Sequence, residues 1–573
     1  MLDKLFLIIF LLHCVPMPTL DSRRLFKRSW NGWTFLVIAI ALLILAPIGV
    51  VLSSVLTNSG TVWNYLLATV LPDYISSSLW LMLGVGLCTV VIGVGTAWLV
   101  TMCRFPGQRL LEWALLLPLA APAYVLAYVY TEMLEFYGPV QLALRDMFGW
   151  TSVNDYWFPT VRSLGGAIAI ISLVLYPYVY LLSRVAFLEQ SVCTLEASRL
   201  LGCNPWRSFM RVALPLARPA IVAGVSLVLM ETLNDFGTVQ YFAVNTFSVG
   251  IYRTWFGMGD RIAASQLSAL LLVFVLLLIG LERWSRQQTR YHHTGRYQRL
   301  SAFRLRGWRA IAAIIVCGLP IVLGFLIPAG RLLYMATSDI THNFSQRFWE
   351  LSRHSLILAA VTAIVAVFVS PILAYGLRLS ANWGMQVAVR TATVGYAIPG
   401  AVIAVGVLFP IGAIDNAVDA GMRSTFGIST GLLLSGTIIT LVFAYLVRFL
   451  AVSYNTVESS LSRIKPNLDD AARSLGCGTT RTLVQIHAPL MSGGLLTAAI
   501  LVFVDVMKEL PATLIVRPFN FDTLAVEVYR LAADERLAEA AAPALAIVAV
   551  GIIPVIALSR QITRTRPEEI DYR

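Results

Sequence analysis

The sequence predicts an all-α polytopic membrane protein with about 12 transmembrane helices in two parallel six-helix repeats. Three observations predict this fold class. Of the 573 residues 58% are hydrophobic and only 13% are charged, whereas a soluble domain has about 25% charged residues. The apolar residues gather into runs of roughly 20, which matches the hydrocarbon thickness of a bilayer. Finally, long segments recur in order along the chain.

Helices are expected wherever an apolar run is long enough to cross the membrane. In order, the expected spans are 33–55, 78–101, 111–133, 164–184, 219–236, 266–282, 308–329, 355–378, 387–410, 429–450, 492–510 and 541–559. The connections before the first span, between the fourth and fifth, between the sixth and seventh, and after the last are rich in Arg. Because cytoplasmic connections carry the excess of Arg and Lys, both termini are expected in the cytoplasm.

The formal net charge of +12 comes from 39 Arg and four Lys against 31 acidic residues. These basic residues lie mostly between the apolar runs, where they report orientation and contact anionic membrane lipid. We therefore expect membrane lipid as a partner and no nucleic acid.

Two long segments are repeated. Residues 78–99 match 355–376 at an offset of 277, and residues 195–216 match 469–490 at an offset of 274. Each repeat holds an even number of spans, so the halves share one orientation and a pathway is expected between them. The expected organisation is a cytoplasmic N-terminal extension (1–32), a first six-span half (33–282), an Arg-rich cytoplasmic linker (283–307), a second six-span half (308–559) and a cytoplasmic tail (560–573).

The sequence contains no nucleotide-binding P-loop, because none of the four lysines has the Gly before and the Ser or Thr after that this motif requires. It also contains no HExxH motif and no CxxC pair. We expect no catalytic residues and no cofactor bound by this chain, and if ATP drives this protein, the ATPase is another chain. A metal site cannot be assigned from these motifs.

The most specific signal is a short pattern that occurs in both halves: an acidic residue, two small residues, a Gly, and a Pro 13 residues after the Gly. Small residues permit close helix approach, Gly permits a turn with positive φ, and Pro resets the chain before the next span. The acid favours the start of a helix through the macrodipole. The residues are Glu196, Ala197, Ser198, Gly202 and Pro215 in the first segment, and Asp470, Ala471, Ala472, Gly476 and Pro489 in the second.

These segments resemble the EAA loops of ABC-importer permeases, from which they depart at Ser198, Asp470 and Ala488. The resemblance implies a short helix, ended near the Gly, that docks on a separate ATP-binding subunit. His487 lies inside the second segment, and we expect it to be a solvated or packing residue rather than a metal ligand.

Nearly the whole chain from the second span onward is similar to the fused ferric-iron permeases of binding-protein-dependent importers. The most specific stretches are DFGTVQYF, from Asp235, and KELPATLIVRPFNFDTLA, from Lys508. This resemblance implies ferric iron import from periplasm to cytoplasm across the bacterial inner membrane by alternating access. The implied partners are a periplasmic ferric-binding protein and a homodimer of ATP-binding cassette subunits, which bind the ATP.

Four acids form a second candidate site. Glu231 and Asp235, and at the repeat offset Asp505 and Glu509, are each spaced i, i+4 and share one helical face. Carboxylates near a span suit the path of a hard cation. Alternatively, Asp505 pairs with Lys508 at i, i+3 and the other acids serve as gate or structural residues. Both interpretations remain open, so these five residues are a candidate cation path or gate.

Two other functions remain open. The same class of importer could carry thiamine, a phosphonate or a polyamine. A twelve-span secondary transporter could couple to protons through Glu231 or Asp505, although such a protein has no ATPase on which the repeated segments could dock.

Overall fold

The computed structural model describes residues 32–57, 60–190, 198, 200–202, 204–287, 303–338, 340–380 and 382–564. The chain forms two compact units. The first comprises Met1–Thr57, Leu356–Val506 and Ile515–Phe519, and the second comprises Asn58–Ser355, Met507–Leu514 and Asn520–Arg573. Most of the N-terminal extension, residues 288–302 of the linker and residues 565–573 of the tail lie outside the described residues.

In the first unit, the N-terminal helix α2 (Gly32–Ser53) packs against α19 and α20. The approach is close, because a Cβ atom added at Gly406 would lie 2.5 Å from the carbonyl oxygen of Pro47, as expected for membrane helices that meet at small residues. The other elements are η2 (Ser54–Leu56), α18 (Gln346–Leu379) from Leu356 onward, α19 (Trp383–Ala392), η8 (Gly395–Ala397), α20 (Gly400–Phe426), α21 (Ile438–Ser462), α22 (Asn467–Ser474), α23 (Thr479–Thr482), η9 (Leu483–His487), α24 (Ala488–Leu490) and α25 (Ser492–Lys508) as far as Val506.

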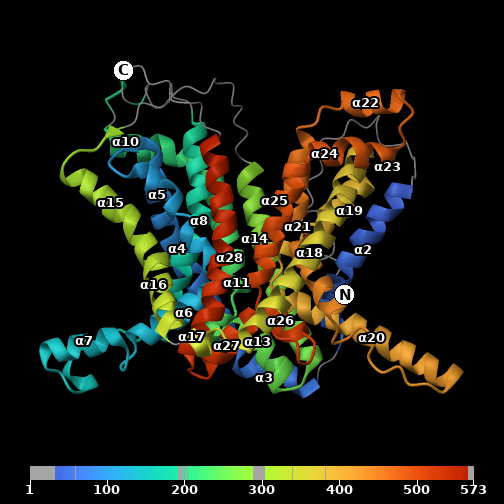
Figure 1. Ribbon diagram of the computed structural model, residues 1–573, viewed down its shortest axis with the longest axis horizontal. Coiled ribbons are helices and arrows are strands. Elements are labelled where there is room, and N and C mark those ends of the chain that lie inside the picture. The colour runs from blue at the N-terminus through green and yellow to red at the C-terminus, as the bar shows by residue number, and fades with distance from the viewer. Residues whose placement is uncertain are drawn as a thin grey trace. The chain divides into compact units, whose positions relative to one another are not determined.

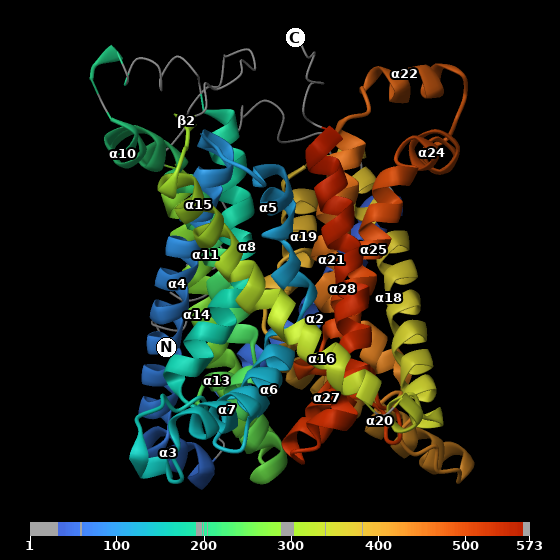
Figure 2. The same cartoon turned by 60° about the vertical axis from the view of Figure 1, so that its left-hand side comes forward.

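The second unit has a core of α4, α8 and α11, which pack against one another (Figure 2), while α28 packs against α16 and α27. Its helices before the linker are α3 (Gly60–Thr69), α4 (Leu71–Met102), α5 (Gln108–Ala114), η3 (Leu117–Ala120), α6 (Ala123–Leu134), α7 (Pro139–Phe148), η4 (Val153–Asp155), α8 (Leu164–Glu189), α10 (Pro205–Ser208), η5 (Phe209–Ala213), α11 (Leu214–Asn234), α12 (Gly237–Tyr241), α13 (Phe247–Tyr252), η6 (Arg253–Gly257) and α14 (Arg261–Gln287). After the linker come α15 (Trp308–Ile321), η7 (Val322–Leu326), α16 (Ile327–Ser338), α17 (Ile340–Asn343), the first turns of α18, α26 (Pro511–Val516) as far as Leu514, α27 (Leu524–Ala533) and α28 (Leu537–Arg564).

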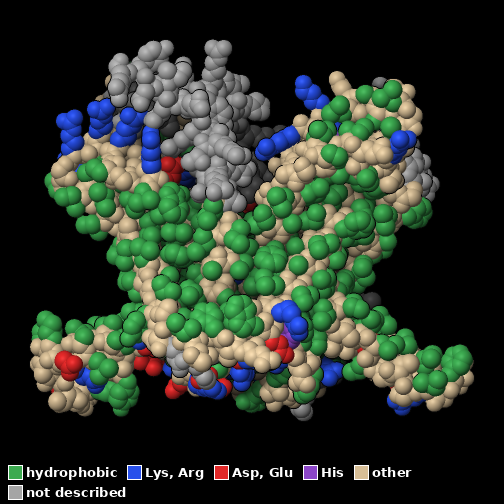
Figure 3. All heavy atoms as spheres, viewed as in Figure 1, with side chains coloured by type: hydrophobic (Ala, Val, Ile, Leu, Met, Phe, Trp, Pro, Cys, Tyr) green, Lys and Arg blue, Asp and Glu red, His purple; other side chains and the backbone are tan. Residues whose placement is uncertain are grey.

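The all-α polytopic fold class is confirmed. Within the described residues, 10 helices are long and apolar enough to cross a membrane, or up to 12 if each of two bent pairs is one span. Hydrophobic side chains cover the lengths of these helices, and charged side chains gather at their ends (Figure 3). One small departure is a parallel pair of two-residue strands, β1 (Cys103–Arg104) and β2 (Phe303–Arg304).

Several expected span boundaries are wrong. The runs 111–133 and 387–410 were expected to be single spans, but each is interrupted before a helix that begins after a proline: α6 follows Pro122 and α20 follows Pro399. Both prolines have extended backbone, with ψ of 145° and 140°. Proline also has no N–H to continue a preceding helix, so an apolar run can break there without becoming less apolar. The run expected at 429–450 begins instead at Ile438.

Local geometry recurs at the repeat offsets, which supports the internal repeat. Ser78 and Ser355, 277 residues apart, each accept a hydrogen bond from the first amide of a helix, that of α13 at 3.4 Å and that of α27 at 2.8 Å. The π-helices η5 and η9 are 274 residues apart. The compact units nevertheless combine both halves, since α2 belongs to the first unit and α28 to the second. The domain boundaries given above stay a prediction.

Candidate coupling segments and carboxylate helices

The second candidate coupling segment is built on helix α22, which stands between two loops at one end of the first unit (Figures 1 and 2). Gly476 ends this helix with a φ of 78°. The amide of Cys477 donates to the carbonyl of Ala472 at 2.9 Å, and the amide of Gly476 donates to that of Arg473 at 3.1 Å. This is a Schellman cap, which requires a left-handed residue and therefore favours glycine. The expected short helix ended near the Gly is present.

The two faces of α22 differ in exposure. Ala472 is buried, whereas Asp470 and Ala471 are exposed, and the side chain of Leu475 is 83% exposed. The side of α22 away from Ala472 is therefore open to solvent.

The buried face of α22 is held by Asp469, a residue that the sequence analysis did not single out. Its Oδ2 accepts hydrogen bonds from Nε and Nη2 of Arg378 at 2.9 and 2.5 Å, and Nε2 of His487 lies 2.7 Å from its Oδ1. Arg378 also donates to the carbonyl of Leu461 at 2.9 Å. One carboxylate therefore joins α22 to the ends of α18 and α21 and to η9.

The electrostatics of Asp469 follow from these contacts. Burial raises the pKa of the carboxyl group, but the hydrogen bonds from His487 and Arg378 outweigh burial and lower the pKa below its usual range. Asp470, which was predicted from the sequence, is exposed, and its Oδ1 lies 3.7 Å from Nη2 of Arg473. The available signal was helical spacing, since Asp469 and Ala472 are three residues apart and share the buried face.

In the first candidate segment, Glu196 and Ala197 lie outside the described residues. Ser198 is buried, and its hydroxyl lies 2.8 Å from that of Ser208. Gly202 has a φ of 80°, and Leu201 before it is 84% exposed. These values match those of the equivalent Gly476 and Leu475.

We expected each proline to reset the chain before the next span. Instead, a helical run continues through both prolines. Pro215 lies in the first turn of α11, directly after η5, and the helical run Trp206–Asn234 continues through it. The amide before it, that of Leu214, bonds to the carbonyl of Phe209, five residues back. This wider π-turn accommodates the missing N–H and the ring of a proline. Pro489 follows η9 in the same way, although a bend of 79° comes directly after it.

Two of the four predicted acids cap helices. Asp235 accepts the amides of Thr238 and Val239 at 3.0 and 3.2 Å, at the start of α12. Glu509 accepts the amide of Ala512 at 2.9 Å, at the start of α26. Carboxylates stabilise helix N-termini in this way. Asp235 and Glu509 therefore have a structural role, whatever else they do.

The other members of the candidate cation path are Glu231, Asp505 and Lys508. Glu231 and Asp505 are half-buried, and Glu231 accepts a bond of 3.4 Å from the amide group of Asn234. Lys508 donates to the carbonyl of Leu119 at 3.1 Å. Within the described ranges, no group of three or more His, Cys, Asp or Glu side chains is arranged to hold a metal ion. The path or gate role of these residues stays a prediction.

Helix α6 adds two tyrosines that the sequence analysis missed. Tyr124 and Tyr128 are buried with ring centroids 5.8 Å apart, and their hydroxyl groups have no hydrogen-bond partner within the described part of the chain. Glu509 and Asp235 lie near enough for their charges to act on the Tyr124 hydroxyl. Buried hydroxyl groups without a partner are uncommon and need an explanation. Their spacing of four residues within an apolar run was the available signal.

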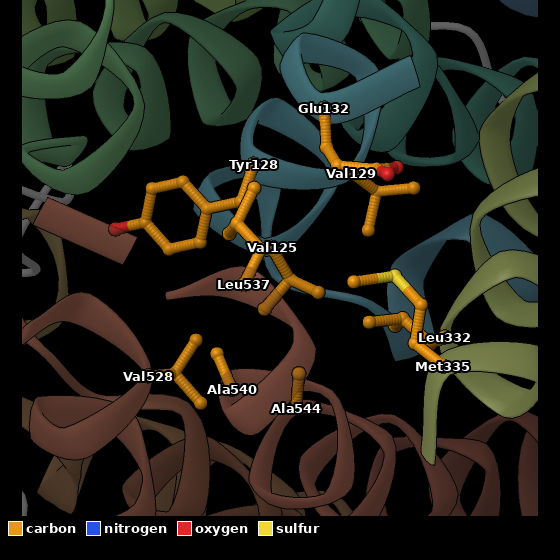
Figure 4. A pocket seen from close by; sticks show the side chains of 10 residues that line it. All are labelled: Val125, Tyr128, Val129, Glu132, Leu332, Met335, Val528, Leu537, Ala540 and Ala544. Carbon is orange, nitrogen blue, oxygen red and sulfur yellow. The ribbon is translucent and has the colours of Figure 1, made fainter. Parts of the chain in front are cut away.

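Tyr128 also lines a narrow hollow in the second unit (Figure 4). Its lining is otherwise nearly all apolar, with Val125, Leu332 and Met335 among the residues shown. The exception is Glu132, whose Oε1 lies 2.5 Å from Nη2 of Arg331. Because that carboxylate is already paired, the hollow carries no evident polar ligand site.

The membrane helices define a polytopic membrane protein with two matching end segments. Residues 89–291 match the family described as binding-protein-dependent transport system inner membrane component. The sulfate transport system permease protein CysT of Escherichia coli is 32% identical over 200 residues, which cover 33% of this chain and 67% of that protein. The chain belongs to this family of inner membrane transport components.

Two other relatives show how the similarity is distributed. The Fe(3+)-transport system permease protein FbpB 2 of Haemophilus influenzae is 24% identical over 502 residues, which cover 86% of this chain and 90% of that protein. The molybdenum transport system permease protein ModB of Escherichia coli is 27% identical over 204 residues, 35% of this chain and 86% of that protein. A protein matched almost entirely by about a third of this chain is consistent with two fused halves.

Family membership has direct consequences. The chain is a multi-pass inner membrane protein and a permease component rather than a catalytic enzyme. A binding-protein-dependent system implies a periplasmic binding protein and ATPase partners.

Proposed function

We propose that this chain is the permease subunit of an ATP-driven ABC importer that moves ferric iron from periplasm to cytoplasm by alternating access. In this proposal both termini are cytoplasmic, and a homodimer of separate ATP-binding cassette subunits binds and hydrolyses the ATP. A periplasmic ferric-binding protein delivers the iron, and membrane lipid surrounds the spans. The chain supplies coupling and passage and binds no cofactor itself.

The observation that carries the coupling role is the matched geometry of the two end segments. Gly202 and Gly476 have φ values of 80° and 78°, and each follows a leucine that is more than four-fifths exposed. A left-handed turn that presents an exposed apolar residue in both halves suits two equivalent docking surfaces, as a homodimeric partner would require.

Two observations support ferric iron as the cargo. A relative that matches 86% of this chain is called an Fe(3+)-transport system permease protein. Carboxylate and phenol oxygens are hard donors that suit a hard trivalent cation, and Asp235 and Glu509 lie near the buried hydroxyl of Tyr124.

Docking is tested by placing a charge on the exposed face of α22. Ala471→Glu should abolish co-purification of the ATP-binding subunit, because the charge would be buried without a partner in the docked complex. The matched control is Ala143→Glu on α7, where the alanine is also exposed, and it should leave co-purification unchanged. Normal co-purification of Ala471→Glu would refute docking through α22.

Cargo is tested by uptake of radiolabelled ferric iron in cells that lack this chain, with and without its re-expression. Restored uptake that disappears on ATP depletion supports the proposal. A second candidate cargo is an oxyanion, because relatives are called molybdenum and sulfate permeases. Restored uptake of labelled molybdate or sulfate, with no change in iron uptake, would favour that candidate.

A further inference from the structure

The residues near the two coupling segments differ in chemistry at equivalent positions, although Gly202 and Gly476 share one backbone conformation. Beneath the second segment lie Tyr375, Arg378 and His487, with Asp469 between the last two. At the repeat offsets, the first half has Trp98, Thr101 and Ala213 in place of these three, and Leu195 in place of Asp469.

In the first half, aromatic side chains surround the position that corresponds to Tyr375. The ring of Trp98 lies 5.5 Å from that of Phe187 and 4.8 Å from that of Phe209. Thr101 bonds only locally among the hydrogen bonds that the structure gives for its side chain, to the carbonyl of Ala97 at 2.7 Å and that of Trp98 at 3.3 Å. These ring contacts are apolar and not directional, although Nε2 of Gln190 also donates to the carbonyl of Ala213, the residue at the position of His487, at 2.8 Å.

In the second half, the side chains beneath α22 form ionic contacts and are mostly buried. His487 is fully buried, and the side chains of Asp469 and Arg378 are only 13% and 18% exposed. Arg378 contacts Asp469 through two nitrogens and uses a third for the carbonyl of Leu461. Charge-assisted bonds from a planar guanidinium fix direction as well as distance.

The same junction reaches the N-terminal helix of the first unit. The ring of His487 lies 5.2 Å from that of Tyr375, and Tyr375 meets Trp33 of α2 edge to face at 5.6 Å. Trp33 also donates from Nε1 to the hydroxyl of Thr479 at 3.1 Å, between α22 and η9. Four helical segments, α2, α18, α21 and η9, therefore converge on one carboxylate and its histidine.

We propose that Asp469, Arg378 and His487 are positioning residues that fix coupling helix α22 to the spans of the first unit. Motion of α22 then passes directly to α18, α21 and η9, whereas in the first half Trp98, at the position of Tyr375, packs on Phe187 and Phe209. This assignment rests on the proposed coupling function for its consequence in transport, but the anchor itself can be tested without any partner.

The anchor is tested first on the full-length chain alone, by limited trypsin digestion in detergent. Arg473 lies in α22, and Arg207 of the first segment provides an internal control site. Asp469→Asn should speed cleavage after Arg473 by about tenfold, because local opening exposes the site, while cleavage after Arg207 keeps its rate. Asp146→Asn, at an exposed acid of α7, should change neither rate. An unchanged rate after Arg473 in Asp469→Asn would overturn the anchor.

Conservative variants separate positioning from general packing. His487→Gln retains a side-chain N–H donor and should keep most of the protection of Arg473 against trypsin, whereas His487→Ala should lose this protection. Arg378→Lys should lose it as well, because an ammonium cannot reproduce the forked contact. The double variant Asp469→Asn with His487→Ala should be no worse than either single change, since all three residues act as one network. Additive losses would contradict a single network.

The consequence for coupling is tested in the complete transporter reconstituted in liposomes. Asp469→Asn should retain the ATP-binding subunit and its ATP hydrolysis but transport about tenfold less iron per ATP hydrolysed, within the usual range of coupling between sites. Loss of the subunit, or an unchanged ratio, would overturn the positioning role. If the unchanged chain binds no ATP-binding subunit, the proposed function fails instead, and the trypsin experiment still decides the anchor.

Discussion

Asp235 and Glu509, 274 residues apart in the sequence, have equivalent positions, and each carboxylate accepts backbone amides at the start of the short helix that follows it. The carboxylates therefore stabilise the breaks after α11 and α25, where the backbone would otherwise leave amides unpaired. This finding separates them from Glu231 and Asp505, which lie one helical turn earlier on α11 and α25. The two pairs should respond differently to mutation.

Asp235→Ala should lower the free energy of unfolding by about 1 kcal/mol, the usual cost of losing an N-cap. Asp235→Asn should lower it much less, because asparagine caps helices almost as well as aspartate. Thermal unfolding of both variants in detergent checks this expectation. Equal losses would mean that the negative charge, rather than the capping geometry, stabilises the break.

Glu231→Gln combined with Asp505→Asn should lower iron uptake while co-purification of the ATP-binding subunit and its ATP hydrolysis stay unchanged. The reason is that both substitutions remove a negative charge near a span without removing a helix cap. Uptake in cells is the measurement, and Asp146→Asn is the control for an exposed acid. Unchanged uptake would favour the structural or gating interpretation of these acids.

Tyr124→Phe should leave the free energy of unfolding unchanged or raise it by up to about 1 kcal/mol, because it removes a buried hydroxyl that lacks a protein partner. We expect the same variant to reduce iron uptake, since the hydroxyl lies near Glu509 and Asp235 in the proposed passage. Thermal unfolding and uptake measured together check both halves of the prediction. Higher stability with normal uptake would leave this hydroxyl without a transport role.

The fold class and the repeat could be predicted from the sequence because both depend on long-range patterns of apolar residues. The breaks could not be placed, because an apolar run keeps its composition on both sides of Pro122 or Pro399. The π-helices were also missed, although η5, η7 and η9, three of the four among the described residues, each end two residues before a proline, whereas η6 does not. The missing N–H of proline supplies a physical reason for that regularity.

The coupling segments were predicted from residue types, and their glycine turns have the expected conformation. Their anchor was not predicted, because Arg378, Asp469 and His487 come from three separate elements that only the tertiary fold brings together. Tyr124 was missed for a similar reason, since an apolar run conceals one hydroxyl until the burial of that hydroxyl is known.

Breaking the buried pair of Glu112 on α5 and Arg184 on α8 should strongly destabilise the second unit. Their side chains are only 9% and 4% exposed and are in direct contact. Glu112→Gln should cost about 3–5 kcal/mol, because it leaves a buried charge uncompensated. Glu539→Gln, which breaks the more exposed pair with Arg536, should cost at most about 1 kcal/mol. Similar costs in thermal unfolding would contradict this expectation.

Two glycines of the second coupling segment differ in backbone conformation but not in the space around them. Gly476 has a φ of 78° and Gly478 a φ of −69°, and a Cβ atom added at either would meet nothing within 4 Å. Gly476→Ala should therefore cost about 1–2 kcal/mol of local stability through the left-handed conformation alone. Gly478→Ala should be neutral or slightly stabilising. We expect Gly476→Ala to speed trypsin cleavage after Arg473 and to weaken co-purification of the ATP-binding subunit, and Gly478→Ala to do neither. Equal behaviour of the two variants would show that the cap at Gly476 does not shape the docking surface.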